Sequence, residues 1–262
     1  MKIQLLTYNN LNEHSEKIAH FSSTRIGGIS TGVFESLNLG EYTDDVPTNI
    51  TRNRELLASE LGIPSTHIFN AHQVHGIAVK FVDEALIELS LEDRKSALQG
   101  FDAFICDLPS ICITVTTADC VPILLFDPIN KAVGAIHSGW RSTLHNIVKE
   151  TIHAMHQKFD TQASDLVAAI GPCISQKVYE VGEEVYSEFS VKGFDMDATF
   201  LSKQKGKYLF DIREAVRLQL VEIGVSDIAV SPYCTFTNDE LFFSARKLGT
   251  KSGRMLSGIL IL

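Results

Sequence analysis

Apolar residues in the middle of the chain gather in three runs that each have the length of a β-strand. The first run is followed by Asp119-Cys120, and the third by His137-Ser138-Gly139. Buried strands that end on such side chains place them where a rigid sheet meets its loops, and active sites are commonly assembled there. The pattern therefore predicts three strands with candidate chemistry at their ends, over residues 111–117, 121–126 and 132–136.

Apolar positions at helical spacing predict several helices around these strands. Asp211 followed by Glu214 is a capping-box pattern that opens one of them, and Gly62 is placed to cap the end of another. The polar and charged segment 84–98 is expected to form a solvated helix or a loop. Besides this segment, the expected helices span residues 48–61, which Gly62 caps, 144–155, 178–189 and 211–224, which Asp211 opens.

Further strand-like runs lie on both sides of the central three, over residues 68–81, 166–170, 228–230, 241–244 and 258–262. Residues 19–40 are rich in Gly, Ser and Thr and are expected to form an extended loop after a first strand pair. Strands outnumber helices without strict alternation, which favours an α+β fold with mixed sheets over a doubly wound sheet. Because no repeat or linker divides the sequence, we expect a single domain over residues 1–262.

Composition and charge exclude several classes of protein. The net charge of −9 and the lack of a basic patch argue against nucleic acid as a partner. All apolar runs are strand-sized, so we expect no transmembrane helix, and the first ten residues lack the pattern of a secretion signal. Five cysteines without short-spaced pairs favour a reducing, cytoplasmic compartment.

His75, Cys120 and His137 are the candidate catalytic and metal-binding residues, since each lies at the end of a strand-like run. Two histidines and a thiolate form a reasonable zinc set, and catalytic zinc leaves a fourth position for a water molecule whose pKa falls to about 7. The spacing alone fits equally a buried cysteine and hydrogen-bonded loop histidines. His72 is a rival to His75, but Gly76 follows His75 and lets the backbone approach a ligand closely. A metal-free alternative uses Cys120 as a nucleophile and a histidine as its base.

Seven segments occur in consistent order from about Phe21 to the C-terminus: FSSTRIGG, SLNLG, HQVHG, TADCVPILLFD, GAIHSGWR, GPCISQKVYEVGEEV and CTF…FFSARK…GR. Together they resemble the YfiH/YlmD-like family, whose bacterial members have been labelled polyphenol oxidases or laccase-domain proteins and whose human relative is FAMIN. The resemblance implies two packed mixed sheets flanked by helices, in α/β/β/α layers like those of a bacterial toxin deamidase.

The same resemblance implies a zinc site of two histidines and one cysteine, which maps onto His75, Cys120 and His137. It also implies purine nucleosides and phosphate as substrates, through phosphorolysis of adenosine, inosine, guanosine and methylthioadenosine and through deamination of adenosine. A member has also been associated with peptidoglycan-precursor editing. The chain lacks the His-x-Glu…Pro-Cys-x-x-Cys signature of cytidine-type deaminases, so deamination would use different groups.

Phosphorolysis needs an anion site, and Arg25, Arg141 and Arg246, which lie within the matched segments, are the candidate arginines. A guanidinium fork suits phosphate oxygens, although a surface ion pair is the alternative for each.

Asn38 is a candidate for binding polar groups of the ligand or a turn residue. Asp119 is a candidate to orient a histidine, to act as a base or to cap a turn. Members commonly have an aromatic residue and two arginines where this chain has Ala-Arg-Lys from position 245, which puts its substrate preference in question.

Four hypotheses of function follow. The first is a zinc-associated purine nucleoside phosphorylase with adenosine deaminase activity, and the second is a Cys-His hydrolase that acts on an amide or a peptidoglycan precursor. The third is a binding protein with a structural zinc ion. The fourth is a copper-binding polyphenol oxidase, since a His-Cys-His set also binds copper. A multicopper oxidase needs many histidines, usually in His-x-His pairs, and this chain has nine histidines and no such pair.

Overall fold

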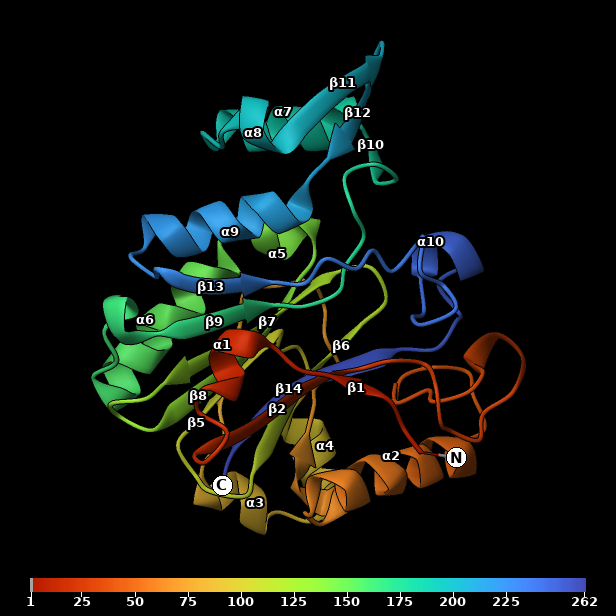
Figure 1. Cartoon of the computed structure of the whole chain (residues 1–262), viewed down its shortest axis with the longest axis vertical. Helices are drawn as coiled ribbons and strands as arrows, with labels where there is room; N and C mark the ends of the chain where they lie inside the picture. The colour runs from red at the N-terminus through yellow and green to blue at the C-terminus, as the bar shows by residue number, and fades with distance from the viewer. Residues whose placement is uncertain (1) are drawn as a thin grey trace.

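Two large mixed sheets form the centre of the molecule in the computed structural model, which describes residues 2–262 (Figure 1). The first sheet has the order β1-β2-β14-β6-β3, with β1 (Leu5–Leu6), β2 (Ile18–Ser23), β3 (Ile68–Phe69), β6 (Cys112–Thr117) and β14 (Met255–Ile261). The second has the order β13-β9-β7-β8-β5-β4, with β4 (Val79–Phe81), β5 (Ala103–Cys106), β7 (Val121–Asp127), β8 (Ala132–Ser138), β9 (Val167–Ile170) and β13 (Asp227–Val230). Both contain parallel and antiparallel pairs, as the sequence predicted.

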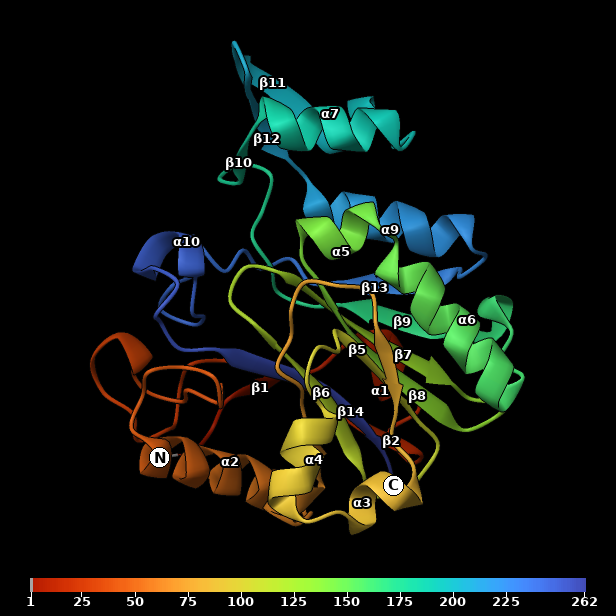
Figure 2. The same ribbon diagram turned by 180° about the vertical axis from the view of Figure 1, so that it is seen from behind.

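Helices cover the outer faces of both sheets (Figures 1 and 2). Three lie on the six-stranded sheet: α5 (Trp140–Leu144), α6 (Ile147–Phe159) and α9 (Ile212–Glu222). On the five-stranded sheet lies α2 (Pro47–Leu61), which ends at Gly62 with a φ of 69°. The shorter helices are α1 (Asn9–Asn12), α3 (Glu84–Glu88), α4 (Leu91–Ala97), α10 (Ala245–Leu248) and the 3₁₀ turns Gly32–Phe34, Ser65–His67 and Ala163–Asp165. The layers are therefore helix, sheet, sheet, helix.

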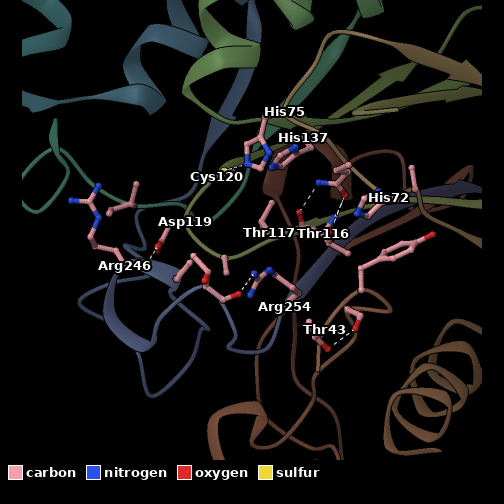
Figure 3. Close-up of a pocket in the computed structure, with 18 of the residues that line it drawn as sticks. Thr43, His72, His75, Thr116, Thr117, Asp119, Cys120, His137, Arg246 and Arg254 are labelled. Carbon is pink, nitrogen blue, oxygen red and sulfur yellow. Dashed lines mark hydrogen bonds between the residues drawn. The ribbon is translucent and has the colours of Figure 1, made fainter. Parts of the chain in front are cut away.

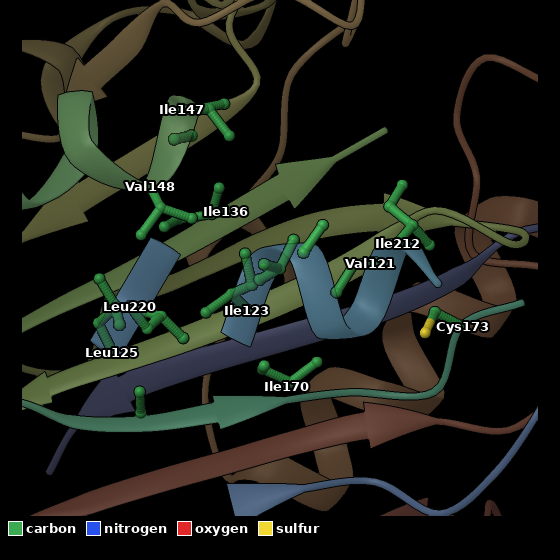
Figure 4. Close-up of a cluster of buried hydrophobic side chains, with 14 of the residues drawn as sticks. Val121, Ile123, Leu125, Ile136, Ile147, Val148, Ile170, Cys173, Ile212 and Leu220 are labelled. Carbon is green, nitrogen blue, oxygen red and sulfur yellow. The ribbon is translucent and has the colours of Figure 1, made fainter. Parts of the chain in front are cut away.

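The core is divided by the sheets into layers. Strand β6 shows how: Ile113 and Val115 point between the two sheets, whereas Cys112 faces α2 on the other side. This alternation follows from the two-residue period of a strand. The cluster outside the six-stranded sheet joins β7, β8 and β9 to α6 and α9 (Figure 4). Both faces of this sheet are thus buried, which fixes the strand ends that bear the candidate site.

A small third sheet lies at one end of the molecule (top of Figure 1). It contains β10 (Glu180–Gly182), β11 (Phe200–Gln204) and β12 (Lys207–Phe210), and it packs against α7 (Glu183–Val191), with α8 (Met196–Thr199) beside it. Phe189, Phe200 and Phe210 hold it together, with ring centroids 4.4–5.6 Å apart. The predicted helix over residues 178–189 was therefore wrong at its start, because residues 180–182 pair with β12.

Two other predicted strands differ from the structure. Residues 70–78, inside the predicted strand 68–81, form a loop apart from one isolated bridge at His72. Their backbone N–H groups at Val74, His75 and Gly76 bind the carboxylate of Asp102 instead of a neighbouring strand. Residues 241–244 are irregular, because Phe242 and Phe243 are buried among side chains without strand pairing. None of the helices within residues 2–262 is long and apolar enough to cross a membrane.

Candidate metal centre

His75, Cys120 and His137 converge at one end of the central strands (Figure 3). His137 lies near the end of β8, Cys120 lies directly before β7, and His75 lies in the loop between β3 and β4. Their ligand atoms all lie within 4.8 Å of one another, and Cys120 Sγ is 3.7 Å from His75 Nε2. His137 is buried, Cys120 is half-buried and His75 is exposed, so the group opens to solvent on one side.

Asp102 organises both histidines. Its Oδ1 lies 2.8 Å from Nδ1 of His137, which leaves Nε2 of that ring for the site. The same carboxylate accepts the backbone N–H groups of Val74, His75 and Gly76 at 3.2, 2.9 and 2.7 Å. Asp102 is completely buried, and a buried carboxylate is stable only when such donors replace water. One side chain thus orients one imidazole and holds the loop of the other.

Backbone conformation brings the three side chains close. His75 has a φ of 61° and Asp119 a φ of 98°, both in the left-handed region that non-glycine residues seldom adopt. Gly139 faces the site, and a Cβ atom there would lie 2.6 Å from Cδ2 of His75 and 3.2 Å from Sγ of Cys120. A glycine is therefore required next to the two side chains, whatever they bind.

The electrostatics favour a charged thiolate. Burial alone would raise the pKa of Cys120, but the imidazoles of His137 and His75 lower it well below its ordinary value. Burial would lower the pKa of His137, but Cys120 and Asp102 raise it. The ionised forms of Cys120 and His137 stabilise each other. A thiolate is both the nucleophilic and the metal-binding form of cysteine.

The donor set suits a zinc ion. One thiolate and two imidazoles are ligands that zinc prefers, and ligand atoms around tetrahedral zinc lie roughly 3.5 Å apart. The 3.7 Å separation of Cys120 and His75 is close to that value. The Asp102–His137 bond is the outer-shell partner that metal-binding histidines usually have. Residues 2–262 contain no second group of three such side chains.

A cavity of about 540 Å³ adjoins the three side chains. His72 lies on one side of it and Arg246 on the opposite side (Figure 3). Tyr42, Gln73 and Tyr179 also line it. Gln73 is tied to Thr116 by three hydrogen bonds, so it braces the loop of His75. The ring of His72 packs against that of Tyr42, with ring centroids 4.7 Å apart. His72 does not belong to the group formed by His75, Cys120 and His137. The preference for His75 thus agrees with this geometry, although residues 72–75 are not a strand.

Two arginines reach this cavity. Arg254 donates three of its N–H groups to the carbonyls of Thr250, Ser252 and Gly253, which fixes the plane of its guanidinium. Its remaining donors are left for a ligand, because a guanidinium has more N–H groups than these carbonyls use. Arg246 donates to the carbonyl of Glu180 at 3.1 Å and lies over the ring of Tyr179. Both line the cavity.

The other predicted ligand-binding residues lie outside this cavity. Arg25 donates to the carbonyls of Glu35 and Asp239 and covers the ring of Phe243. Arg141 is exposed at the start of α5 and lies over Trp140. Asn38 is fully buried, and its amide accepts the N–H groups of Gly40 and Arg254. Asn38 therefore supports the backbone at Arg254 rather than facing the cavity.

Asp119 lines the cavity, but both of its oxygens are occupied. Oδ1 accepts the hydroxyl of Thr235 at 2.6 Å, and Oδ2 accepts the backbone N–H of Arg246 at 2.7 Å. These bonds connect the segment before β7 to the loop after β13 and to the beginning of α10. The arrangement favours Asp119 as an anchor for Arg246 over Asp119 as a base.

Sequence reasoning missed Asp102 and Arg254. Asp102 is a polar residue directly before the buried strand β5, whereas Cys120 was singled out as a residue at the end of a strand-like run. Arg254 belongs to the Gly-Arg pair of the last matched segment, which was noticed without being assigned to the anion site. Neither signal says where the side chain points.

The fold and the site together define a two-sheet α+β protein with a Cys-His₂ centre. The chain belongs to the family described as multi-copper polyphenol oxidoreductase laccase, whose model matches residues 19–262. It is 40% identical to a purine nucleoside phosphorylase of Bacteroides thetaiotaomicron, over 98% of this chain and 96% of that protein. It is 35% identical to adenosine deaminase RL5 of an unknown prokaryotic organism, over 93% and 94%. The expected YfiH/YlmD-like membership is thereby confirmed.

Solved structures agree with the fold. YlmD of Geobacillus stearothermophilus superposes with a TM-score of 0.87 at 31% identity, covering 93% of this chain and 92% of that one. The YfiH protein of Bacillus licheniformis superposes with a TM-score of 0.88 at 28% identity, covering 94% and 93%. The expected arrangement of two packed mixed sheets flanked by helices is confirmed.

Proposed function

We propose that this protein is a purine nucleoside phosphorylase that also deaminates adenosine, with a zinc ion held by His75, Cys120 and His137. The observation that carries the proposal is the single cavity that joins these three side chains to Arg246 and Arg254. The names of the similar enzymes supply the substrate class. Adenosine, inosine, guanosine and methylthioadenosine are the proposed nucleosides.

In phosphorolysis a phosphate oxygen forms a bond to C1′ of the ribose while the bond from C1′ to the purine breaks. The purine leaves with the bonding electron pair and takes up a proton, and ribose 1-phosphate is released. Arg254 and Arg246 are the groups proposed to bind phosphate, because planar guanidinium groups match its oxygens. The fixed plane of Arg254 means that little side-chain entropy is lost when phosphate binds.

In deamination a hydroxyl group replaces the amino group at C6 of adenine, and ammonia leaves. A bound zinc ion would supply a water molecule of lowered pKa for this reaction. His137, with Nδ1 fixed by Asp102, presents Nε2 on the same side as Cys120. The exposed edge of His75 leaves this face of the group open to a substrate in the cavity.

The test is to incubate purified protein of measured metal content with adenosine and phosphate. We expect adenine and ribose 1-phosphate, with inosine as the product of deamination, separated by chromatography. Cys120→Ala is the matched control, since it removes one proposed ligand at a half-buried position. A zinc-loaded protein that turns over none of the four nucleosides would contradict the proposal.

A second candidate is a cysteine hydrolase, favoured by the series Cys120, His137 and Asp102. A thiolate beside an imidazole that is oriented by a carboxylate is the arrangement of thiol hydrolases. Its substrate would be an amide, including the amide bonds of peptidoglycan precursors. A chelator separates the two candidates, because a metal-free nucleophile keeps its activity when zinc is removed.

Copper remains an alternative ion for the same three ligands, since affinity rises towards copper for a given site. A four-copper oxidase, however, needs several histidine-rich sites. Residues 2–262 hold one group of three metal-binding side chains. We therefore do not propose multicopper oxidase chemistry, and elemental analysis of protein purified without added metal identifies the ion.

A further inference from the structure

A second cavity, of about 300 Å³, lies beside the metal-centre cavity. It is enclosed by α2, α4 and the segment around β3, and α2 and α4 lie side by side at one end of the molecule in both views (Figures 1 and 2). Glu41 and Tyr42 line both cavities and so form the wall between them. Its volume is at the small end of the range of ligand pockets.

The charge of the second cavity is opposite to that of the chain. Arg54, Arg94 and Lys95 line it together with one carboxylate, that of Glu41. Arg54 lies 3.4 Å from Glu41, but neither Arg94 nor Lys95 has a carboxylate within 4.0 Å among residues 2–262. Two positive charges are thus left over in a protein whose net charge is −9. Such a concave basic surface concentrates anions.

Arg94 is held in place without an acidic partner. Its guanidinium lies 4.6 Å from the centre of the Phe69 ring and donates to the carbonyls of Thr66 and Ile87. Its Nε atom is buried and has no hydrogen-bond partner. A fixed, half-buried cation with an unused donor costs free energy unless something else compensates it.

Asn70 carries a second buried donor without a hydrogen-bond partner, its side-chain N–H₂ group. Its side chain is 5% exposed, lines the cavity and makes no hydrogen bond to any described residue. Buried amides are normally hydrogen-bonded, so an amide without a partner next to a basic cavity needs an explanation. Ser65 and Thr66, which carry hydroxyl groups, also line the cavity.

We infer that this second cavity is a binding site for a small phosphomonoester, separate from the metal centre. A phosphate group offers several strong acceptor oxygens, which match the guanidinium, ammonium, amide and hydroxyl donors around the cavity. A carboxylate offers only two acceptor oxygens, one fewer than a phosphomonoester. The small organic part of the ligand would pack on Leu91 and Leu98, which line the same cavity. The site is independent of the proposed reaction, because none of its cations belongs to the metal centre.

The location is tested by soaking crystals in tungstate, an electron-dense analogue of phosphate. We expect an anomalous peak beside Arg94 and Lys95, besides any peak at Arg254. A peak at Arg254 alone, or an adventitious ion at a surface position alone, would overturn the inference. This experiment needs no turnover, so its result is distinct from success or failure of the phosphorylase assay.

The energetics are tested by calorimetric titration with ribose 5-phosphate. Lys95→Glu reverses an exposed charge without removing a core contact, and we expect it to weaken binding at least about fivefold, as loss of a charged hydrogen bond does. Arg52→Glu is the matched control, because Arg52 is an exposed residue of α2 that lines neither cavity. Arg94→Gln should weaken binding similarly. Equal weakening by Arg52→Glu, or no measurable binding to the unmodified protein, would refute the site.

Discussion

Nδ1 of His137 lies 2.8 Å from Oδ1 of Asp102, and the same carboxylate binds the N–H groups of the loop that holds His75. The two proposed histidine ligands come from distant parts of the chain, and one buried side chain aligns both. Asp102 therefore contributes to the alignment of both histidines.

Asp102→Asn should weaken zinc binding by about 10–100-fold, as loss of an outer-shell partner typically does. An amide can accept the loop N–H groups with its oxygen only, so one or two buried donors lose their partner. The free energy of unfolding should fall by about 1–3 kcal/mol. Zinc affinity by competition with a chromogenic chelator and urea unfolding measure the two effects. Unchanged zinc affinity in the folded variant would show that Asp102 does not position the ligands.

Gly139→Ala should impair the metal centre more than the fold. The φ of Gly139 is −82°, which alanine adopts without strain, but the added methyl group would lie 2.6 Å from His75. We expect zinc binding and nucleoside turnover to fall at least about tenfold, since a displacement of about 1 Å in a catalytic group is already costly. Metal content and the thermal unfolding of the metal-free protein are the measurements. A normal zinc content would contradict this prediction, since it would mean that the loop of His75 moves to accommodate the added methyl group without loss of metal binding.

Arg254→Gln should raise the KM for phosphate by about tenfold or more, because a charged hydrogen bond to an anion is lost. Arg246→Gln should act in the same direction. Arg141→Gln is the control: the sequence placed Arg141 in the same class, but its side chain lies outside the cavity. Phosphate dependence of adenine release measures all three variants. If Arg141→Gln raised this KM as much as Arg254→Gln does, the assignment of the phosphate site to Arg254 would be contradicted.

Stability should fall in mild acid because of His20, which is buried and has no carboxylate within 4.0 Å among residues 2–262. Burial lowers the pKa of its imidazole to about 4, and its Nε2 accepts the backbone N–H of Tyr8 at 2.9 Å. The unfolded chain binds this proton at about pH 6.5, so the folded state loses stability as the pH falls from there towards the folded pKa. The loss attributable to this group is about 2 kcal/mol at pH 5.

Urea unfolding at pH 7 and pH 5 tests this prediction. His20→Gln keeps an acceptor for the N–H group of Tyr8 but does not titrate, so its stability should change less between the two pH values. If both proteins lose the same free energy of unfolding, other groups account for the acid sensitivity.

Local patterns determined much of this protein. The central strands, the helix that ends at Gly62 and the cap in which Asp211 accepts the N–H of Glu214 were all predictable, because each depends on residues near one another in sequence. Cys120 and His137 were predictable for a related reason, whereas His75 lies in a loop that the sequence had predicted as part of a strand. Polar residues at the ends of buried strands have few places to go except the edge of the sheet.

Tertiary structure alone decided which polar groups are free to act. Arg25 and Arg254 look alike in the sequence, and both donate to backbone carbonyls, yet only Arg254 lines the cavity beside the metal-binding group. Asp102 acts through a loop that lies 26–28 residues earlier in the chain. Contacts between distant parts of the chain decide whether a side chain is occupied by protein groups or faces a ligand. A local sequence pattern does not contain this information.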